Sequence, residues 1–145
     1  MTFEEQFIGT WSLISMSSQD SDGNIVYPFG KNPTGIITYT KSGRISVHIM
    51  ENNRPIFTSQ DQHNGSDMEI RNAFEGYVAY SGTYTISKEE GKVYHHIETC
   101  LFPNWIGITQ KRSFHLSDNR LTLKTPSIRF RGKSRISTLV WERIL

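Results

Sequence analysis

The stretch Phe7-Ile8-Gly9-Thr10-Trp11 places a Gly-x-Trp triplet at the start of the first predicted strand, Ile8 to Met16. A glycine beside a large indole at a strand start indicates a place where another part of the chain comes very close. It also indicates that the ring fills one end of a hydrophobic core. The last predicted strand, Arg135 to Ile144, contains Trp141-Glu142-Arg143. We therefore predict that the first and last strands meet.

Length and composition favour one globular domain covering residues 1–145. Apolar residues make up 36% and charged residues 21%, which is typical of a soluble domain. No apolar run reaches the roughly 18 residues of a membrane span, and the first residues lack the basic and apolar regions of a signal peptide. Cys100 is the single cysteine, so no internal disulfide can form. We expect a cytoplasmic protein.

The net charge of +2 is small, but six basic residues lie late in the chain with no acid among them. They are Arg120, Lys124, Arg129, Arg131, Lys133 and Arg135. Such a stretch attracts acidic ligands or nucleic acid. Because Phe130 is the one aromatic residue interleaved with them, a solvated pair of strands is the favoured interpretation. We expect no nucleic-acid partner and no membrane, and a partner-binding surface on this stretch is a third, weaker hypothesis.

The clearest hairpin surrounds Thr40-Lys41-Ser42-Gly43-Arg44, where glycine suits the position that needs positive φ. This turn sets Tyr39 opposite Ile45 and Ile37 opposite Val47, so these side chains share a core face and His48 points outward. The segments before it, Ser17 to Asn24 and Tyr27 to Pro33, read as loops, and we expect the second to cross one mouth of the fold.

A long polar loop, Glu51 to Gly65, follows the hairpin and is of a length that is usually functional or mobile. Ser66-x-x-Glu69 then forms a capping box for a short helix, which we expect to lie over the open end of the fold. A second capping pattern, Thr2-x-x-Glu5, predicts a helical turn at the N-terminus that plugs the other end.

Five further predicted strands follow the helix. Pairing Ile86 with Val93 sets Tyr84 opposite His95, Gly82 opposite Ile97 and Tyr80 opposite Thr99. The turn at Asp118-Asn119 pairs Leu116 with Leu121, Phe114 with Leu123 and Arg112 with Thr125. Every turn connects neighbouring strands, so the topology is up-and-down. Alternation in the last strand does not decide whether Val140 or Trp141 points inward.

The chain resembles the lipocalin-like domain family of small intracellular barrels in bacteria and fungi. The residues that carry the resemblance are Gly9-Thr10-Trp11, Val26-Tyr27-Pro28-Phe29-Gly30, Ile37-Thr38-Tyr39 with Gly43-Arg44, Arg54-Pro55, Tyr80-x-Gly82-x-Tyr84, His95-His96-Ile97-Glu98, Pro103-Asn104-Trp105-x-Gly107 and Val140-Trp141-Glu142-Arg143. The resemblance implies an all-β fold: one eight-stranded, up-and-down antiparallel β-barrel in which Arg143 packs on Trp11. The helix after the third strand departs from typical lipocalins, whose helix follows the barrel.

The predicted registers leave polar groups on an otherwise apolar inner face. They are Tyr39, Tyr80, Tyr84, His95, Thr99, Gln110 and Arg112, and the mouth loops add Trp105 and Phe57. A guanidinium inside a barrel is costly unless it meets an acid, a carbonyl or a ligand, so Arg112 is the most informative of them. The set forms either a ligand site or an internally satisfied network.

Two hypotheses about function follow from the ligand site. In the first, the barrel binds a small, mostly apolar molecule with a polar end. In the second, it is a cofactor-free isomerase or cyclase in which His95 and Tyr84 move a proton near Arg112. The sequence contains none of the common nucleotide, hydrolase or metalloprotease motifs. His95 and His96 point to opposite faces of one strand, so we expect neither a metal site nor a cofactor.

Overall fold

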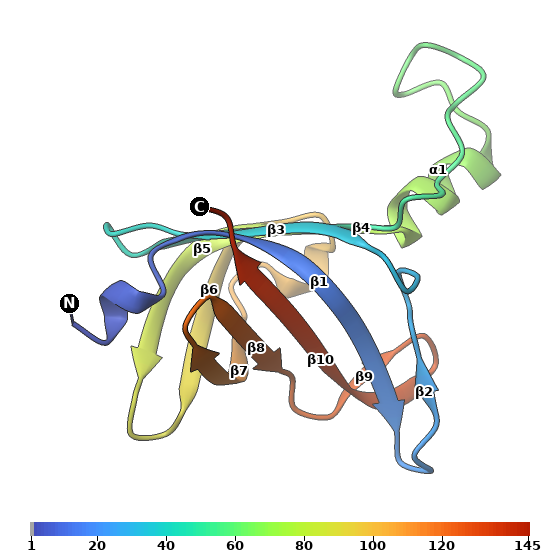
Figure 1. Ribbon diagram of the computed structural model, residues 1–145. Coiled ribbons are helices and arrows are strands. Elements are labelled where there is room, and N and C mark those ends of the chain that lie inside the picture. The colour runs from blue at the N-terminus through green and yellow to red at the C-terminus, as the bar shows by residue number, and fades with distance from the viewer. Residues whose placement is uncertain (1) are drawn as a thin grey trace.

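The computed structural model describes residues 2–145, which form one closed antiparallel barrel with additions at both ends (Figure 1). The barrel strands are β1 (Gly9–Asp20), β3 (Thr34–Tyr39), β4 (Arg44–Met50), β5 (Tyr77–Ser87), β6 (Lys92–Cys100), β7 (Thr109–Ser117), β8 (Arg120–Lys124) and β10 (Lys133–Arg143). Two short strands, β2 (Ile25–Val26) and β9 (Ile128–Phe130), extend the sheet beside β1 and β10. The helices are η1 (Glu4–Gln6), α1 (Asp67–Glu75) and η2 (Pro103–Trp105).

The barrel strands follow one another around the sheet in chain order, and β10 closes against β1. Paired positions along this seam run from Trp11 with Arg143 to Asp20 with Arg135. The predicted up-and-down fold is therefore confirmed. The predicted end of the first strand at Met16 was wrong, because β1 continues to Asp20. Its polar end stays in the barrel since the Ser18 and Ser137 hydroxyls, both buried, hydrogen-bond each other at 2.7 Å.

The β3–β4 hairpin has the predicted register, with Tyr39 opposite Ile45 and Ile37 opposite Val47. The side chains of this face are buried, and His48 is on the outside. Gly43 adopts φ 88° in the turn, which an L side chain would resist.

The β5–β6 register is as predicted from Ile86–Val93 through Gly82–Ile97, and then it shifts. Glu98 is the extra residue of a β-bulge, so Tyr80 pairs with Cys100 and Ser81 with Thr99. The prediction that Thr99 shares the inner face was therefore wrong. Gly82 is required here because a Cβ at this position would lie 1.8 Å from the His96 carbonyl oxygen.

One end of the barrel is closed by Trp11, Arg143 and the segment that precedes Gly9. The Trp11 indole nitrogen donates to the Phe7 carbonyl at 3.0 Å. The Arg143 guanidinium lies 4.3 Å from the centre of the Trp11 ring and donates to the Ile8 carbonyl at 2.7 Å and to the Gln6 carbonyl. A Cβ on Gly9 would lie 2.9 Å from the Arg143 guanidinium. The predicted contact of the two termini is confirmed, with the N-terminal turn packed into this end.

The β8–β10 pairing places Trp141 opposite Leu121, and the Trp141 side chain is 1% exposed. This resolves the ambiguity of the last strand in favour of Trp141 inward. On β7 and β8 the predicted pairs Phe114–Leu123 and Leu116–Leu121 are present, and the ladder ends at Ser113–Lys124, so Arg112 and Thr125 are not a ladder pair.

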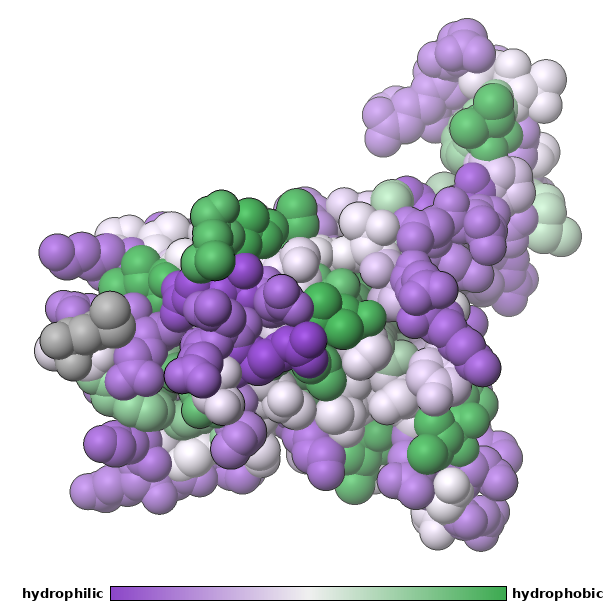
Figure 2. All heavy atoms as spheres, viewed as in Figure 1, coloured by the Kyte–Doolittle hydropathy of each residue, from purple (hydrophilic) through white to green (hydrophobic). Residues whose placement is uncertain are grey.

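The helix α1 begins with the predicted capping box between Ser66 and Glu69. It does not lie over the barrel, however. The loop after β4 and most of α1 project from the barrel as an arm with a largely hydrophilic surface (Figures 1 and 2). Only the C-terminal end of the helix, Phe74 and Glu75, reaches the open mouth. Among residues 2–145, no helix has the length and hydrophobicity needed to cross a bilayer.

Candidate functional site

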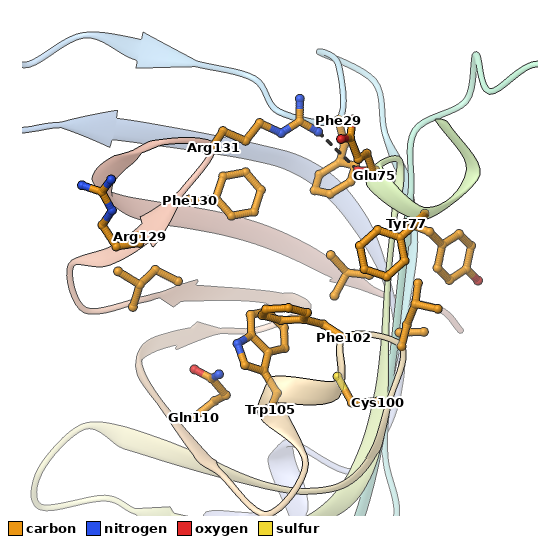
Figure 3. A pocket seen from close by; sticks show the side chains of 15 residues that line it. Phe29, Glu75, Tyr77, Cys100, Phe102, Trp105, Gln110, Arg129, Phe130 and Arg131 are labelled. Atoms are coloured by element: carbon orange, nitrogen blue, oxygen red, sulfur yellow. Dashed lines mark hydrogen bonds between the residues drawn. The ribbon is translucent and has the colours of Figure 1, made fainter. Parts of the chain in front are cut away.

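The open end of the barrel contains an outer cavity of about 690 Å³ (Figure 3). Its walls are mostly aromatic and aliphatic, with Phe29, Phe102, Trp105 and Phe130 among the lining residues. A smaller inner cavity of about 60 Å³ lies in the barrel interior and shares Val78, Trp105, Ile128 and Phe130 with the outer one. The two spaces are therefore adjacent along one path from the mouth to the core.

The mouth is formed by loops from opposite sides of the barrel. Trp105 lies on η2, which begins at Pro103, and its ring makes edge contacts with Phe102 and Tyr80 at centroid distances of 5.5 and 6.2 Å. On the other side, Arg131 lies over the rings of Phe29 and Phe130. Its guanidinium also donates to the Glu75 carbonyl at 3.4 Å, which joins the β9–β10 turn to the end of α1 (Figure 3).

Arg112 lines the inner cavity from β7 and is 7% exposed. Its Nη1 donates to the Gln110 side-chain oxygen at 3.2 Å and to the Lys111 carbonyl at 3.0 Å, and both acceptors are neutral. Within residues 2–145 no carboxylate forms a salt bridge with Arg112, and its Nε and Nη2 have no protein hydrogen-bond partner. A buried guanidinium without an acid is costly, so the inner cavity contains donor capacity that the protein does not use.

His95 lies beside Arg112 and is held between two tyrosines. Its Nε2 is 2.8 Å from the Tyr39 hydroxyl and its Nδ1 is 2.7 Å from the Tyr80 hydroxyl. In the described chain the Tyr39 hydroxyl has no other partner, and Tyr39 is fully buried. Tyr39 must therefore donate to Nε2, because otherwise its proton would be buried without an acceptor. Nδ1 then carries the ring proton and donates to Tyr80.

This arrangement leaves the Tyr80 proton without a protein acceptor, and Tyr80 lines the inner cavity. Burial lowers the pKa of His95 well below its usual value, and Arg112 adds to the effect. Burial also raises the pKa values of Tyr39 and Tyr80, against the opposing effect of Arg112. His95 and both tyrosines are neutral at pH 7, and Tyr80 and Arg112 both present donors to the cavity.

The predicted site residues fall into two groups. Tyr80, His95, Gln110, Arg112 and Trp105 line the inner or the outer cavity, and Tyr39 lies behind His95. Tyr84, Thr99 and Phe57 line neither cavity. The Tyr84 hydroxyl donates to the Thr40 carbonyl at 2.7 Å, toward the closed end, and Thr99 is on the outer surface with Ser81 at 2.6 Å. Phe57 lies on the projecting arm against Gly65.

The sequence reasoning missed the aromatic residues Phe29 and Phe130 as cavity residues. Phe29 lies in the proline-containing loop that was expected to cross a mouth, so that loop contained the available signal. Phe130 was noted only as an interruption of the basic stretch. It also missed Thr125 and Ser137 as cavity residues, although two-residue alternation from Leu121 and Leu123 points to an inward Thr125. In the part of the chain that the structure describes, no group of three or more His, Cys, Asp or Glu side chains could hold a metal ion.

The fold and site define a closed antiparallel β-barrel with an apolar, one-ended cavity. The chain belongs to the family described as the lipocalin-like domain, whose model matches residues 8–144. It is 33% identical over 108 residues to the 4'-hydroxy-3'-methoxypropiophenone carrier protein ppsC of Aspergillus oryzae, covering 69% of this chain and 96% of that protein. A solved structure, that of EF1p2_mFAP2b bound to DFHBI, covers 97% of this chain and 96% of its own at 10% identity and a TM-score of 0.46.

Proposed function

We propose that the protein binds a small, mostly apolar molecule, with its ring or chain in the outer cavity and its polar end directed at Arg112. The observation that carries this proposal is the buried guanidinium without an acid at the inner end of an apolar cavity. The protein retains this costly group, and a ligand oxygen would offset its cost by accepting from Nε or Nη2.

The sizes of the two cavities support this orientation. An outer space of about 690 Å³ is in the range of sites that enclose small organic ligands. The inner space of about 60 Å³ accommodates only a polar group of a few atoms. The aromatic walls at the mouth suit a flat ring, which can pack against Trp105 edge-on or face-on.

The carrier protein of Aspergillus oryzae supports the same ligand class. The molecule in its name is an aromatic ketone with a phenol and a methoxy group. The ring of such a molecule would lie in the outer cavity, and its phenol oxygen would enter the inner cavity. We extend to this chain the class, a small aromatic molecule with a polar end, and not the particular compound.

The cofactor-free isomerase or cyclase hypothesis has less support from the geometry. It assigned proton transfer to His95 and Tyr84, and the Tyr84 hydroxyl is turned toward the Thr40 carbonyl. Both ring nitrogens of His95 are occupied by tyrosine hydroxyls, so neither is free to take a proton from a substrate. Binding without turnover is the function that these contacts favour.

The test is calorimetric titration and thermal unfolding with a panel of small aromatic ketones and phenols, including 4'-hydroxy-3'-methoxypropiophenone. We expect at least one compound to bind and to raise the unfolding temperature as its concentration rises. Trp105→Ala should weaken that binding about tenfold through lost ring contact. Tyr94→Ala, which removes a half-buried aromatic side chain on the outer surface, is the matched control. The proposal fails if no compound binds, or if the two variants bind alike.

A further inference from the structure

The barrel interior has a net positive charge. The buried polar and charged residues in the described part of the chain are Ser18, His95, Gln110, Arg112, Thr125 and Ser137, and none of them is an aspartate or glutamate. The Asp20 side chain is 5% exposed, but it pairs with Lys133 at 3.6 Å. His95, Tyr39 and Tyr80 are held neutral by burial. Arg112 is therefore an unopposed charge beside the inner cavity, and the interior lacks the counter-ion that such a charge requires.

The other titratable groups along the path do not supply that counter-ion. Cys100 lines the outer cavity, and burial raises the pKa of its thiol, so it is neutral at pH 7. Glu75 lines the outer rim, where Arg129 and Arg131 are also present. The rim is thus more basic than acidic, and the field along the path favours entry of an anion.

We infer that the polar end of the ligand is bound as an anion, a phenolate on an aromatic ring, that supplies the missing counter-charge to Arg112. This inference rests on the proposed function and names its ligand class. The inner cavity admits one small group, and a phenolate presents a single charged oxygen at the tip of a flat ring. That oxygen can accept from Arg112 and from the Tyr80 hydroxyl, whose proton has no protein acceptor.

A bound phenolate also accounts for two further features of the site. The basic residues Arg129 and Arg131 lie at the mouth, where they attract an anionic ligand without contacting its charged end. Tyr39 fixes the His95 tautomer so that the Tyr80 proton is directed to the ligand and not to the imidazole. The hydrogen bonds from Tyr39 through His95 to Tyr80 therefore position one donor, the Tyr80 hydroxyl.

Binding of a phenol must then release a proton. The neutral phenol in solution loses its O–H proton to water or buffer, and the phenolate oxygen takes the place beside Arg112. Affinity should fall about tenfold for each pH unit below the phenol's own pKa, because the bound form becomes rarer in solution. His95 titrates only at lower pH, so this slope is expected to appear before the imidazole becomes charged.

The test compares three ligands of similar shape on the wild-type protein: 4'-hydroxy-3'-methoxypropiophenone, its 4'-methyl ether and 4-propionylbenzoate. The absorption spectrum of the bound phenol should be that of the phenolate at a pH where the free compound is neutral. Calorimetry in two buffers of different ionisation enthalpy should report release of about one proton per ligand bound. The methyl ether should bind at least about tenfold more weakly.

A neutral bound spectrum, with the ether binding as well as the phenol, overturns the inference but leaves the proposed function intact. Tight binding of the benzoate, together with a neutral bound phenol, also overturns the inference that the ligand binds as a phenolate. That result would show that Arg112 binds carboxylate ligands. If none of the three compounds nor any of the wider panel binds, the proposed function falls and the inference with it.

Arg112→Met provides an independent check. We expect the phenol to lose about 10- to 100-fold in affinity, and the methyl ether to be unaffected, because only the charged oxygen uses the guanidinium. Arg120→Met, on the outer surface beside Glu142, is the matched control and should leave both affinities unchanged. Equal loss for phenol and ether in Arg112→Met contradicts the inference. Should Arg112→Met fail to fold, Arg112→Gln and the wild-type pH dependence decide the question.

Discussion

Mild acid should destabilise the protein through His95. The imidazole is buried, neutral and bonded at both nitrogens, and burial depresses its pKa well below the ordinary value of about 6.5. Below pH 6.5 the unfolded chain binds a proton at this position and the folded chain does not. Stability therefore rises with pH across this window and is lost as the pH falls.

The size of the effect follows from the proton count. One histidine that stays neutral in the folded state costs about 1.4 kcal/mol of unfolding free energy per pH unit below its unfolded pKa. At pH 5 the loss reaches about 2 kcal/mol, provided that the folded-state pKa lies lower still. For a chain of this size that corresponds to a decrease of about 4–8 °C in unfolding temperature. Asp20 and Glu69 have lowered pKa values and lose their contribution at more acidic pH.

The measurement is urea or thermal unfolding between pH 7 and pH 5 for the wild type, His95→Gln and His96→Gln. His95→Gln should be less stable at pH 7 but should lose this pH dependence. His96 is the neighbouring residue on the outer face, and its substitution should leave the slope unchanged. Retention of the wild-type slope by His95→Gln would show that another group causes the pH dependence.

Four further substitutions test the fold. Gly82→Ala should lower the free energy of unfolding by about 3 kcal/mol in thermal unfolding, since the new Cβ would overlap the His96 carbonyl. Gly91 has φ 65° and open space around it, so Gly91→Ala should lower it by only about 1–2 kcal/mol. Equal losses in the two variants would contradict the steric explanation. Arg143→Lys loses the planar stack on Trp11 and one backbone contact, so we expect about 1–2 kcal/mol of destabilisation in urea. Ser66→Ala removes the helix cap, worth about 1 kcal/mol. Because α1 stands away from the barrel, hydrogen exchange should rise within residues 67–75 while the global unfolding temperature stays constant.

Local chemistry was sufficient to predict several elements. The β3–β4 register follows from a glycine turn and from two-residue alternation, so the side chains from Ile37 to Ile49 could be assigned to a face from sequence. The capping box at Ser66 has short-range hydrogen bonds that need nothing else from the fold. The contact of Trp11 with Arg143 was predicted by resemblance, and its geometry explains why Gly9 has no side chain.

The candidate site was only partly predictable. Alternation placed Tyr80, His95 and Arg112 inside the barrel correctly. It cannot say which of the two tyrosines on β5, Tyr80 or Tyr84, hydrogen-bonds the imidazole. Tyr80 reaches Nδ1, whereas the Tyr84 hydroxyl turns to a backbone carbonyl at the closed end. These distances depend on the curvature of several strands together.

The hairpins, their registers and the polar inner face follow from periodicity and turn residues, whereas the closed barrel and the packing of Arg143 on Trp11 were implied by the resemblance to the lipocalin-like family. The tertiary structure alone decided the bulge at Glu98, the projection of α1 and the aromatic mouth formed by Phe29, Trp105 and Phe130. One inserted residue in a strand turns every later side chain to the opposite face, and no local pattern marks it. Loop side chains are placed by contacts between distant segments, and those contacts exist only after the barrel has closed.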